Sequence, residues 1–335
     1  MLLKNKYAIG THIMFYEIDM VDDFVNSCVI ALGNVDNKTN VVFDFCLNMS
    51  QYFESYDTPD RKKYVTDKWN EIIKPLEKLT TVNTTFYTDD DYAYTLSFYR
   101  RDFNTNYCQD TDYLIWGESD CLIPKETFDC LDTLKEYTNS ENVHRFITTF
   151  AMRKMWDPTW DALVHQDFID KPYYEMDTPE EIKLATTSPW SIRYTMSQEE
   201  MEEINGKVTE YDIKMLTYPK FDGSCLVISS DLVMAGVNIP PAVYINGDDT
   251  SFMNMCDKII GKQYKQYVFK NIMKVHNRNH PRKRRYIKGE DESKISHYKR
   301  KDQTWYQKFN DISKGNLGVL FNSQNRFKRI REIND

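Results

Sequence analysis

Hydrophobic and polar positions follow two periods in the first third of the chain. Short apolar runs predict strands at His12–Asp19, Asn40–Leu47, Thr81–Tyr87 and Asp112–Ile123. Between these runs, apolar residues at helical spacing predict helices at Val21–Leu32, Arg61–Leu79 and Tyr92–Arg101. Alternating strands and helices are typical of a mostly parallel sheet with helices on its faces. We therefore expect an α/β fold.

The pattern is less regular between residues 133 and 221, and a second regular block follows it. The middle part predicts a strand at Arg145–Arg153 and a short acidic helix at Gln198–Ile204, joined by a loop rich in Trp, Pro and Asp. We expect that loop to form part of a substrate pocket. The second block predicts strands at Gly223–Ser229 and Tyr264–Val275 around a helix at Thr250–Gly261. No internal repeat divides the chain, which favours one continuous domain with a basic C-terminal extension.

Length and composition limit the class of protein. The 335 residues can bury a large core, and no stretch approaches the roughly 20 apolar residues that span a bilayer. The first residues, MLLKNKYAIGTH, lack the apolar core of a signal peptide. The seven cysteines are scattered without a CxxC pair, which indicates neither a disulfide framework nor a thiolate zinc site. We expect a cytoplasmic protein without a membrane span, in the host cytoplasm if it is viral.

The charge is unevenly distributed along the chain. The net charge is −8, yet the segment from Lys258 to Asp335 carries 21 Lys and Arg against 7 Asp and Glu. Such asymmetry suggests a polyanionic partner. A basic tail that packs on its own acidic body is an equally good interpretation.

Two acidic clusters each follow an apolar run. Glu118-Ser119-Asp120 lies in the run that ends at Ile123, and Gly247-Asp248-Asp249 follows the segment VNIPPAVYI. Ligands of open α/β sheets bind at the carboxyl ends of the strands, where such acids would lie. On a strand, Glu118 and Asp120 would point to the same side, and two carboxylates can share one Mg²⁺ or Mn²⁺. The second cluster could instead serve only to cap a helix.

A basic loop, VHNRNHPRKRR, follows the second cluster. His276 or His280 could give a neutral imidazole to a metal. The cations that could bind a diphosphate are Arg278, Arg282, Lys283, Arg284 and Arg285. A solvated basic turn is the simpler alternative, but two histidines four residues apart beside a proline favour a function. Together the clusters and the loop predict a divalent metal that holds a phosphorylated substrate.

In this order, the motifs resemble those of the GT-A glycosyltransferases, which move a sugar from a nucleotide diphosphate to an acceptor. The matching segments are Glu118-Ser119-Asp120 for the D-x-D motif, Asp222-Gly223-Ser224 for the glycine-led segment, Gly247-Asp248-Asp249 for the x-E-D motif and His276 for the metal-binding histidine. Arg100 and Arg101 resemble the arginine that precedes the first motif. The likeness covers roughly residues 10 to 285. Glu118 and Asp248 depart from the family's Asp and Glu, whereas Asp120 and Asp249 are retained.

The resemblance implies a Rossmann-like GT-A domain over residues 1–285. Its nucleotide-binding half would be 1–132 and its acceptor and catalytic half 133–285, with residues 286–335 as the basic extension. It also implies an inverting, metal-dependent transfer, with a UDP-sugar as the favoured donor. Asp120, Glu118 and His276 would hold Mn²⁺ or Mg²⁺, and Asp249 would act as general base.

The remaining site residues follow from the same resemblance. The nucleotide would meet Glu17, Asn48 and Asp89, which follow the first three strands, together with Arg100 and Arg101. The diphosphate would meet His280, Arg278, Arg282 and Arg284. The donor sugar and acceptor would meet Gly223, Asp248 and Trp190. Trp116, inside an apolar strand, is expected to pack in the core.

The sequence leaves open the acceptor and alternative classes of protein. The acceptor could be a polyanion, and DNA with a hydroxymethylated base, as in some bacteriophages, is the most specific version. Saccharide, lipid-linked and protein acceptors are alternatives. A Gly-Asp-Asp turn also marks polymerase palms, but the chain is too short for the hand that grips nucleic acid. A non-enzymatic protein that binds polyanions through its tail is the alternative from another class.

Overall fold

The computed structural model describes residues 1–53, 55–56, 59–152, 162–165, 196–217, 221–277, 298–299 and 304–321. Its strands are β1 (Tyr7–Met14), β2 (Val41–Asn48), β3 (Ser55–Tyr56), β4 (Thr81–Tyr87), β5 (Tyr113–Trp116), β6 (Cys121–Leu122), β7 (Phe146–Ala151), β8 (Ile213–Met215), β9 (Leu226–Ser229), β10 (Lys265–Met273), β11 (Val275–His276) and β12 (Tyr298–Lys299). Its α-helices are α1 (Asp22–Gly33), α2 (Pro59–Glu77), α3 (Leu96–Tyr107), α4 (Thr127–Ser140), α6 (Gln198–Asn205), α7 (Ser230–Met234), α8 (Asp248–Ile259) and α10 (Thr304–Phe321).

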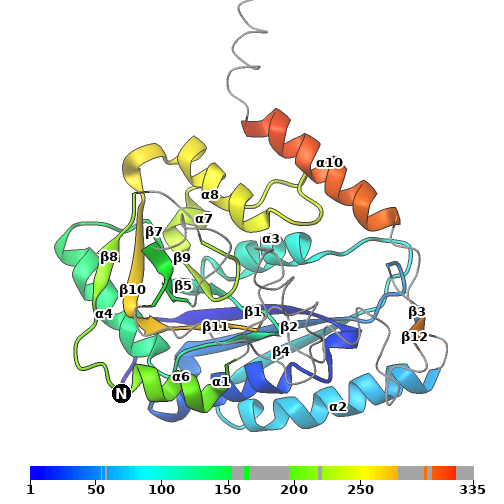
Figure 1. Cartoon of the computed structure of the whole chain (residues 1–335), viewed down its shortest axis with the longest axis horizontal. Helices are drawn as coiled ribbons and strands as arrows, with labels where there is room; N and C mark the ends of the chain where they lie inside the picture. Colours follow the sequence, from blue (N-terminus) through cyan, green and yellow to red (C-terminus); the bar gives the residue numbers. More distant parts are fainter. Residues whose placement is uncertain are drawn as a thin grey trace, which may run out of the picture.

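An eight-stranded sheet in the order β4-β2-β1-β5-β9-β7-β10-β8 forms the centre of the molecule (Figure 1). β4, β2, β1 and β5 run parallel to one another, and β7 and β10 are a further parallel pair. β9 and β8 run antiparallel to their neighbours. The expected α/β fold with a mostly parallel sheet is therefore confirmed. The first four strands of this sheet in chain order are β1, β2, β4 and β5. They lie side by side in the order 3-2-1-4 that is typical of a doubly wound sheet.

Hydrophobic residues fill two cores, one on each face of the sheet. On one face, α1, α2 and α4 contribute Phe24, Trp69 and Leu131. On the other, α3 and α8 contribute Tyr99 and Phe252. Neighbouring strand residues supply opposite cores because side chains alternate along a strand. Burial of both faces explains why β5 is apolar throughout and why β1 is mostly apolar, with Thr11 and His12 as buried polar residues.

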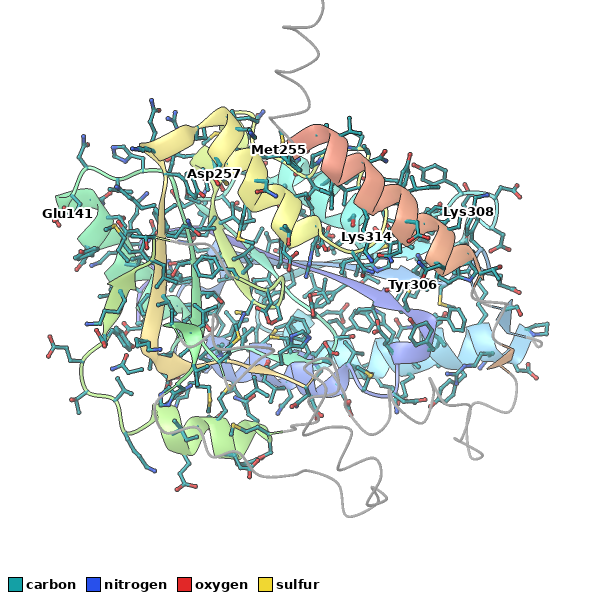
Figure 2. All side chains as sticks on the ribbon, turned by 45° about the horizontal axis from the view of Figure 1, so that its top comes forward. Glu141, Met255, Asp257, Tyr306, Lys308 and Lys314 are labelled. Carbon is teal, nitrogen blue, oxygen red and sulfur yellow. The ribbon has the colours of Figure 1, made fainter. Side chains whose placement is uncertain are left out.

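The helix α10 lies on the same side of the sheet as α3 and α8 (Figure 1). Tyr306 and Lys308 point to opposite sides of it (Figure 2). Asn310 and Ser313 are buried between the helix and the rest of the molecule. Thus part of the expected C-terminal extension packs on the main domain. Among the described residues, no helix has the length and apolar character needed to cross a membrane.

Most predicted elements are confirmed within a few residues, but three boundaries were wrong. The first strand begins at Tyr7 and ends at Met14, where Phe15–Glu17 forms a 3-10 turn. The Glu17 carboxylate accepts a hydrogen bond from the Met14 amide at 2.9 Å, which favours this turn over a longer strand. The helix predicted from Tyr92 begins at Leu96.

The third error concerns the first acidic cluster. The single strand predicted at Asp112–Ile123 is two strands, β5 and β6, with a turn between them. The turn starts at Gly117, where a Cβ atom would lie 2.2 Å from Oγ1 of Thr11 and 2.6 Å from the ring of Phe24. Glu118 and Asp120 therefore lie in a turn and do not alternate along a strand as expected.

Candidate active site

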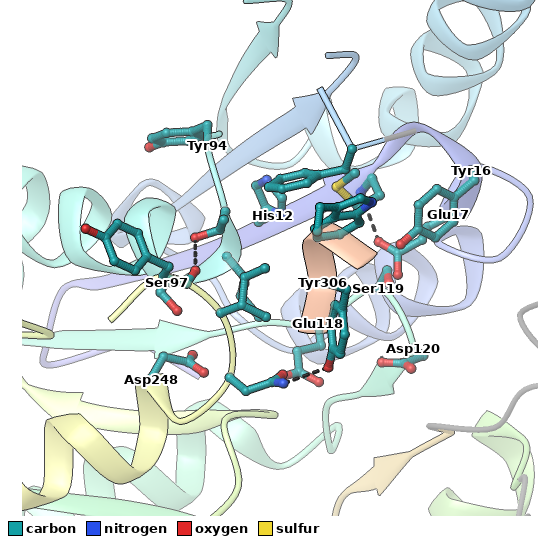
Figure 3. Close-up of a pocket in the computed structure, with 18 residues that line it drawn as sticks. His12, Tyr16, Glu17, Tyr94, Ser97, Glu118, Ser119, Asp120, Asp248 and Tyr306 are labelled. Atoms are coloured by element: carbon teal, nitrogen blue, oxygen red, sulfur yellow. Dashed lines mark hydrogen bonds between the residues drawn. The ribbon is translucent and has the colours of Figure 1, made fainter. Parts of the chain in front are cut away.

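A cavity of about 250 Å³ lies at the carboxyl ends of β1 and β5 (Figure 3). These adjacent strands mark the point where the strand order reverses, which is where doubly wound sheets bind ligands. The wall combines residues from six places: the end of β1 with the turn that follows it, Phe53 in the segment after β2, the turn after β5, the start of α3, the segment 244–248 and the start of α10. The fold thus brings Glu118 and Asp120 of the first acidic cluster and Asp248 of the second to one cavity.

Glu118, Asp120 and His276 form a cluster with metal-ligand geometry. Their ligand atoms all lie within 4.8 Å of one another. Nε2 of His276 is 3.0 Å from Oε2 of Glu118 and 3.4 Å from Oδ1 of Asp120. Two carboxylates and one imidazole are a donor set suited to Mn²⁺ and, through the oxygens, to Mg²⁺. The residues present therefore fit the expected divalent metal.

The short strand β11 brings His276 to the two acids. It pairs antiparallel with β6, and His276 lies opposite Cys121, the residue that follows Asp120. The amide of Asn277 donates to the carbonyl of Asp120 at 2.7 Å. The backbone thus fixes the separation of His276 and Asp120, so the triad is preorganised by the fold.

Asp222 and Lys274 support His276 from behind. Nδ1 of His276 is 3.2 Å from Oδ2 of Asp222, and Nζ of Lys274 is 2.5 Å from Oδ1 of the same carboxylate. Ser224 Oγ also donates to Oδ2 at 2.9 Å. Carboxylates in this position orient ligating imidazoles and raise their basicity. The buried ion pair neutralises Lys274, which is fully inaccessible to solvent.

The cluster shifts the pKa values of its members in opposite directions. Burial raises the pKa of Glu118, but His276 and Arg100 outweigh burial and lower it to about 2. Burial lowers the pKa of His276, but Asp120 and Glu118 outweigh burial and hold it well above its usual value. Without metal the imidazole is therefore protonated and stabilises the two carboxylates. A metal that takes Nε2 must displace that proton.

Arg100 connects the two acidic clusters. One guanidinium nitrogen, NH2, donates to Oε1 of Glu118 at 2.7 Å and to the carbonyl of Gly223 at 2.9 Å. The other, NH1, pairs with Oδ2 of Asp248. Its side chain is buried with the guanidinium carbon 4.7 Å from the ring of Trp116, which is fully buried as expected. Arg100 thus forms an ion pair with one carboxylate from each cluster.

Only glycine fits at position 223, because the guanidinium of Arg100 occupies the space that a side chain would need. A Cβ atom there would lie 2.2 Å from NH1 of Arg100. Gly223, which the resemblance places at the donor sugar, has a packing role in the structure, since it lets the guanidinium reach its carbonyl.

A tight turn delivers Asp248 and Asp249 to the start of α8. Asn246 and Gly247 both adopt left-handed conformations, with φ of 56° and 80°, which favour Asn and Gly. The two acids differ in burial and in their contacts. Asp248 is buried, pairs with Arg100 and lines the cavity. Asp249 is partly exposed and accepts from the amide of Thr250 at 2.6 Å.

The environment of Asp249 makes it a stronger base than an ordinary carboxylate. Burial of its carboxylate and the neighbouring Asp248 raise its pKa to about 7, and Asp222 adds to this effect. A carboxylate with a pKa near neutrality is suited to accept a proton at physiological pH. The cavity wall includes Asp248 but not Asp249, so Asp249 follows a wall residue without lining the cavity itself.

The expected nucleotide-binding residues have different surroundings. Glu17 lines the cavity. Asn48 is buried, and its amide donates to Nε2 of His12 at 3.2 Å and to the carbonyl of Tyr94 at 2.8 Å. Asp89 is in an exposed loop, where it accepts from the amide of Asp91 at 2.8 Å. The structure does not bring Asn48 or Asp89 to the cavity wall.

The two arginines of α3 are also separated. Arg100 contacts the carboxylates described above, whereas Arg101 lies in another surface groove with Asn238 and Pro240. Several expected residues lie outside the described part of the chain: Trp190, Arg278, His280, Arg282 and Arg284. Of the two candidate histidines, the structure therefore describes His276 alone.

Some cavity and site residues were missed by the sequence analysis. His12 lines the cavity with a neutral imidazole, because burial and Arg100 lower its pKa to about 3. Lys274 supports the metal cluster. His12 is a polar residue inside the mostly apolar strand β1, and Lys274 stands between the apolar residues Met273 and Val275, so the local sequence could have marked both. Trp305 and Tyr306 also line the cavity, and nothing in their local sequence links them to the distant acidic clusters.

No protein-family profile and no curated protein sequence matches the chain. TarS from S. aureus, residues 1–349, superposes with a TM-score of 0.39 at 10% identity and covers 78% of this chain and 60% of the TarS chain. UDP-glucose pyrophosphorylase in complex with UDP-glucose gives 0.34 at 8% identity and covers 79% of this chain and 90% of that chain. TM-scores this low carry no functional conclusion, so function must be inferred from the site.

Proposed function

We propose that the protein is a GT-A-type glycosyltransferase that uses a nucleotide diphosphate sugar. The observation that carries this proposal is the triad of Glu118, Asp120 and His276 at the cavity where the strand order reverses. Hollows of this kind accept nucleotides, and a carboxylate-bound divalent cation is the usual partner of a diphosphate. The order of the sequence motifs supports the same class.

The proposed reaction is an inverting transfer from a UDP-sugar. Asp120, Glu118 and His276 would hold Mn²⁺ or Mg²⁺, which offsets the charge that develops on the leaving diphosphate. The acceptor oxygen forms a bond to the anomeric carbon as the bond from that carbon to the diphosphate oxygen breaks. Asp249 takes the proton of the acceptor hydroxyl, a role that its pKa of about 7 supports. Asp222 keeps the His276 ring oriented.

The acceptor is proposed to be a polyanion. The support is the excess of 21 basic over 7 acidic residues from Lys258 onward. DNA with a hydroxymethylated base is the specific candidate within that class. The affinity of the protein for such DNA should fall steeply as the salt concentration rises, because binding releases counterions from the phosphates. An affinity independent of salt would contradict a nucleic-acid acceptor.

The test is a turnover assay with Mn²⁺ and a panel of UDP-, GDP- and ADP-sugars, with mass spectrometry of the acceptors. Wild type should release the nucleoside diphosphate and add the sugar to the acceptor. Asp249→Asn should bind the donor but lose at least about 100-fold in kcat, whereas Asp110→Asn, at an exposed acid, should match wild type. Release of sugar 1-phosphate, or full turnover by Asp249→Asn, would contradict the proposed chemistry.

A further inference from the structure

The C-terminal helix α10 forms one wall of the cavity. Trp305 and Tyr306 line it together with residues from the first half of the chain. The helix is fixed to the segment that leads to Asp248: Ser313 Oγ accepts from the amide of Tyr244 at 3.0 Å, and Asn246 donates to the hydroxyl of Tyr306 at 2.6 Å. α10 is therefore built into the site.

Aromatic side chains gather at this wall. The ring of Trp305 lies 4.1 Å from that of Phe53, centroid to centroid, with an angle of 34° between the planes. Tyr16 and Tyr94 also line the cavity. Acidic groups occupy another part of its wall, at Glu118, Asp120 and Asp248 (Figure 3). One cavity thus offers aromatic surface and a metal-binding cluster together.

Trp305 differs from a residue that only holds the helix in place. Phe309, one turn further along α10, packs against Phe53 and Tyr244 but does not line the cavity. Trp305 lines it, and its indole Nε1–H is buried without a hydrogen-bond partner among the described residues. Buried indole N–H groups usually have a partner, so an acceptor atom on a ligand is a natural occupant.

We propose that Trp305, with Tyr306 and Phe53, binds the planar heteroaromatic ring of the nucleotide while the acidic cluster serves its phosphates. This inference rests on the proposed function, because it assigns the ring of the same ligand to one part of the cavity. Aromatic side chains bind bases by stacking, which tolerates any base, and the Trp305 N–H adds one donor. The C-terminal segment would then be a donor-binding element.

The test separates ring binding from metal binding. Affinities of UMP, AMP and GMP are measured without metal, and those of UDP-sugars with Mn²⁺, by calorimetry. Trp305→Ala should weaken the monophosphates at least about tenfold. Trp305→Phe, which keeps a ring but lacks the N–H, should weaken them about three- to tenfold. Val319→Ala, at a 78% exposed position on α10, should match wild type.

The outcomes distinguish the two proposals. If wild type binds UDP-sugars with Mn²⁺ and both Trp305 variants bind every ligand as wild type does, the ring site is refuted and the proposed function stands. If wild type binds no nucleotide with or without metal, the ring site and the proposed function are both refuted. Thermal unfolding is recorded for each variant. Should Trp305→Ala fail to fold, Trp305→Leu, which keeps an apolar side chain but has no ring, decides: unchanged monophosphate affinity refutes the ring site, and weakened affinity supports it. Unchanged affinity in Trp305→Phe refutes the N–H contact.

Discussion

Nδ1 of His276 lies 3.2 Å from Oδ2 of Asp222, on the side of the ring away from Glu118 and Asp120. This contact orients the imidazole so that Nε2 faces the two carboxylates of the cluster. Lys274, which pairs with the other oxygen of Asp222, fixes that carboxylate in turn. The metal cluster is therefore backed by a chain of buried polar contacts.

Replacement of Asp222 by Asn should weaken Mn²⁺ binding about 10- to 100-fold, because the imidazole loses its charged partner. The variant should also unfold at lower temperature, since Lys274 is left without its charged partner. Calorimetric Mn²⁺ titration and thermal unfolding measure the two effects. Asp110→Asn, at an exposed acid, is the control. A folded Asp222→Asn that binds Mn²⁺ as tightly as wild type would refute the supporting role.

Neighbouring arginines of α3 offer a matched pair of variants. Arg100→Lys keeps the charge but loses the fork that contacts Glu118, Asp248 and the Gly223 carbonyl together. It should lower the free energy of unfolding by about 2–3 kcal/mol. Arg101→Lys, at a surface groove, should change it by less than about 0.5 kcal/mol. Equal losses for the two variants, measured by urea unfolding, would contradict the bridging role of Arg100.

Gly223→Ala should force the Arg100 guanidinium away from Asp248, because the new Cβ would lie 2.2 Å from NH1. We expect a loss of about 1–3 kcal/mol in the free energy of unfolding. Gly33→Ala is the control: Gly33 is helical and has open space around its Cβ position, so a gain of up to about 1 kcal/mol is expected. The close contact at Gly223 would be disproved by urea unfolding curves in which Gly223→Ala is as stable as wild type.

Asp249 should make stability depend on pH in a characteristic direction. Its pKa is about 7 in the folded protein and about 4 in an unfolded chain, so the folded state binds the extra proton between these values. Stability from this group is present below pH 4 and is lost as pH rises to 7. Asp249→Asn should therefore gain ~1–2 kcal/mol over wild type at pH 8, after allowance for solvent screening, and little at pH 4.

The measurement is thermal unfolding of wild type and Asp249→Asn at several pH values in the presence of a chelator. Asn can still accept from the amide of Thr250, so this hydrogen bond is kept. A difference between the two proteins that is the same at pH 4 and pH 8 would show that the Asp249 pKa is not raised.

The sequence predicts the α/β order well because strand and helix periods are local properties. β4, at Thr81–Tyr87, was predicted with its observed ends. The grouping of Glu118, Asp120 and His276 was expected from the resemblance to the GT-A motifs, whereas the residues alone left His276 and His280 as alternatives. Ion pairs between residues far apart in the sequence were not predicted. An example is the pair of Arg100 and Asp248, which are 148 positions apart. The same holds for Trp305, whose helix carries no pattern that links it to the cavity.

The central claim is that Glu118, Asp120 and His276 bind the metal on which donor binding depends. The most direct test is calorimetric titration of UDP-sugars into wild type and Asp120→Ala, each with and without Mn²⁺. We predict that wild type binds a UDP-sugar tightly only with Mn²⁺ and that Asp120→Ala loses at least about 100-fold of this affinity while it remains folded. Equal Mn²⁺-dependent affinity in the two proteins would contradict the claim.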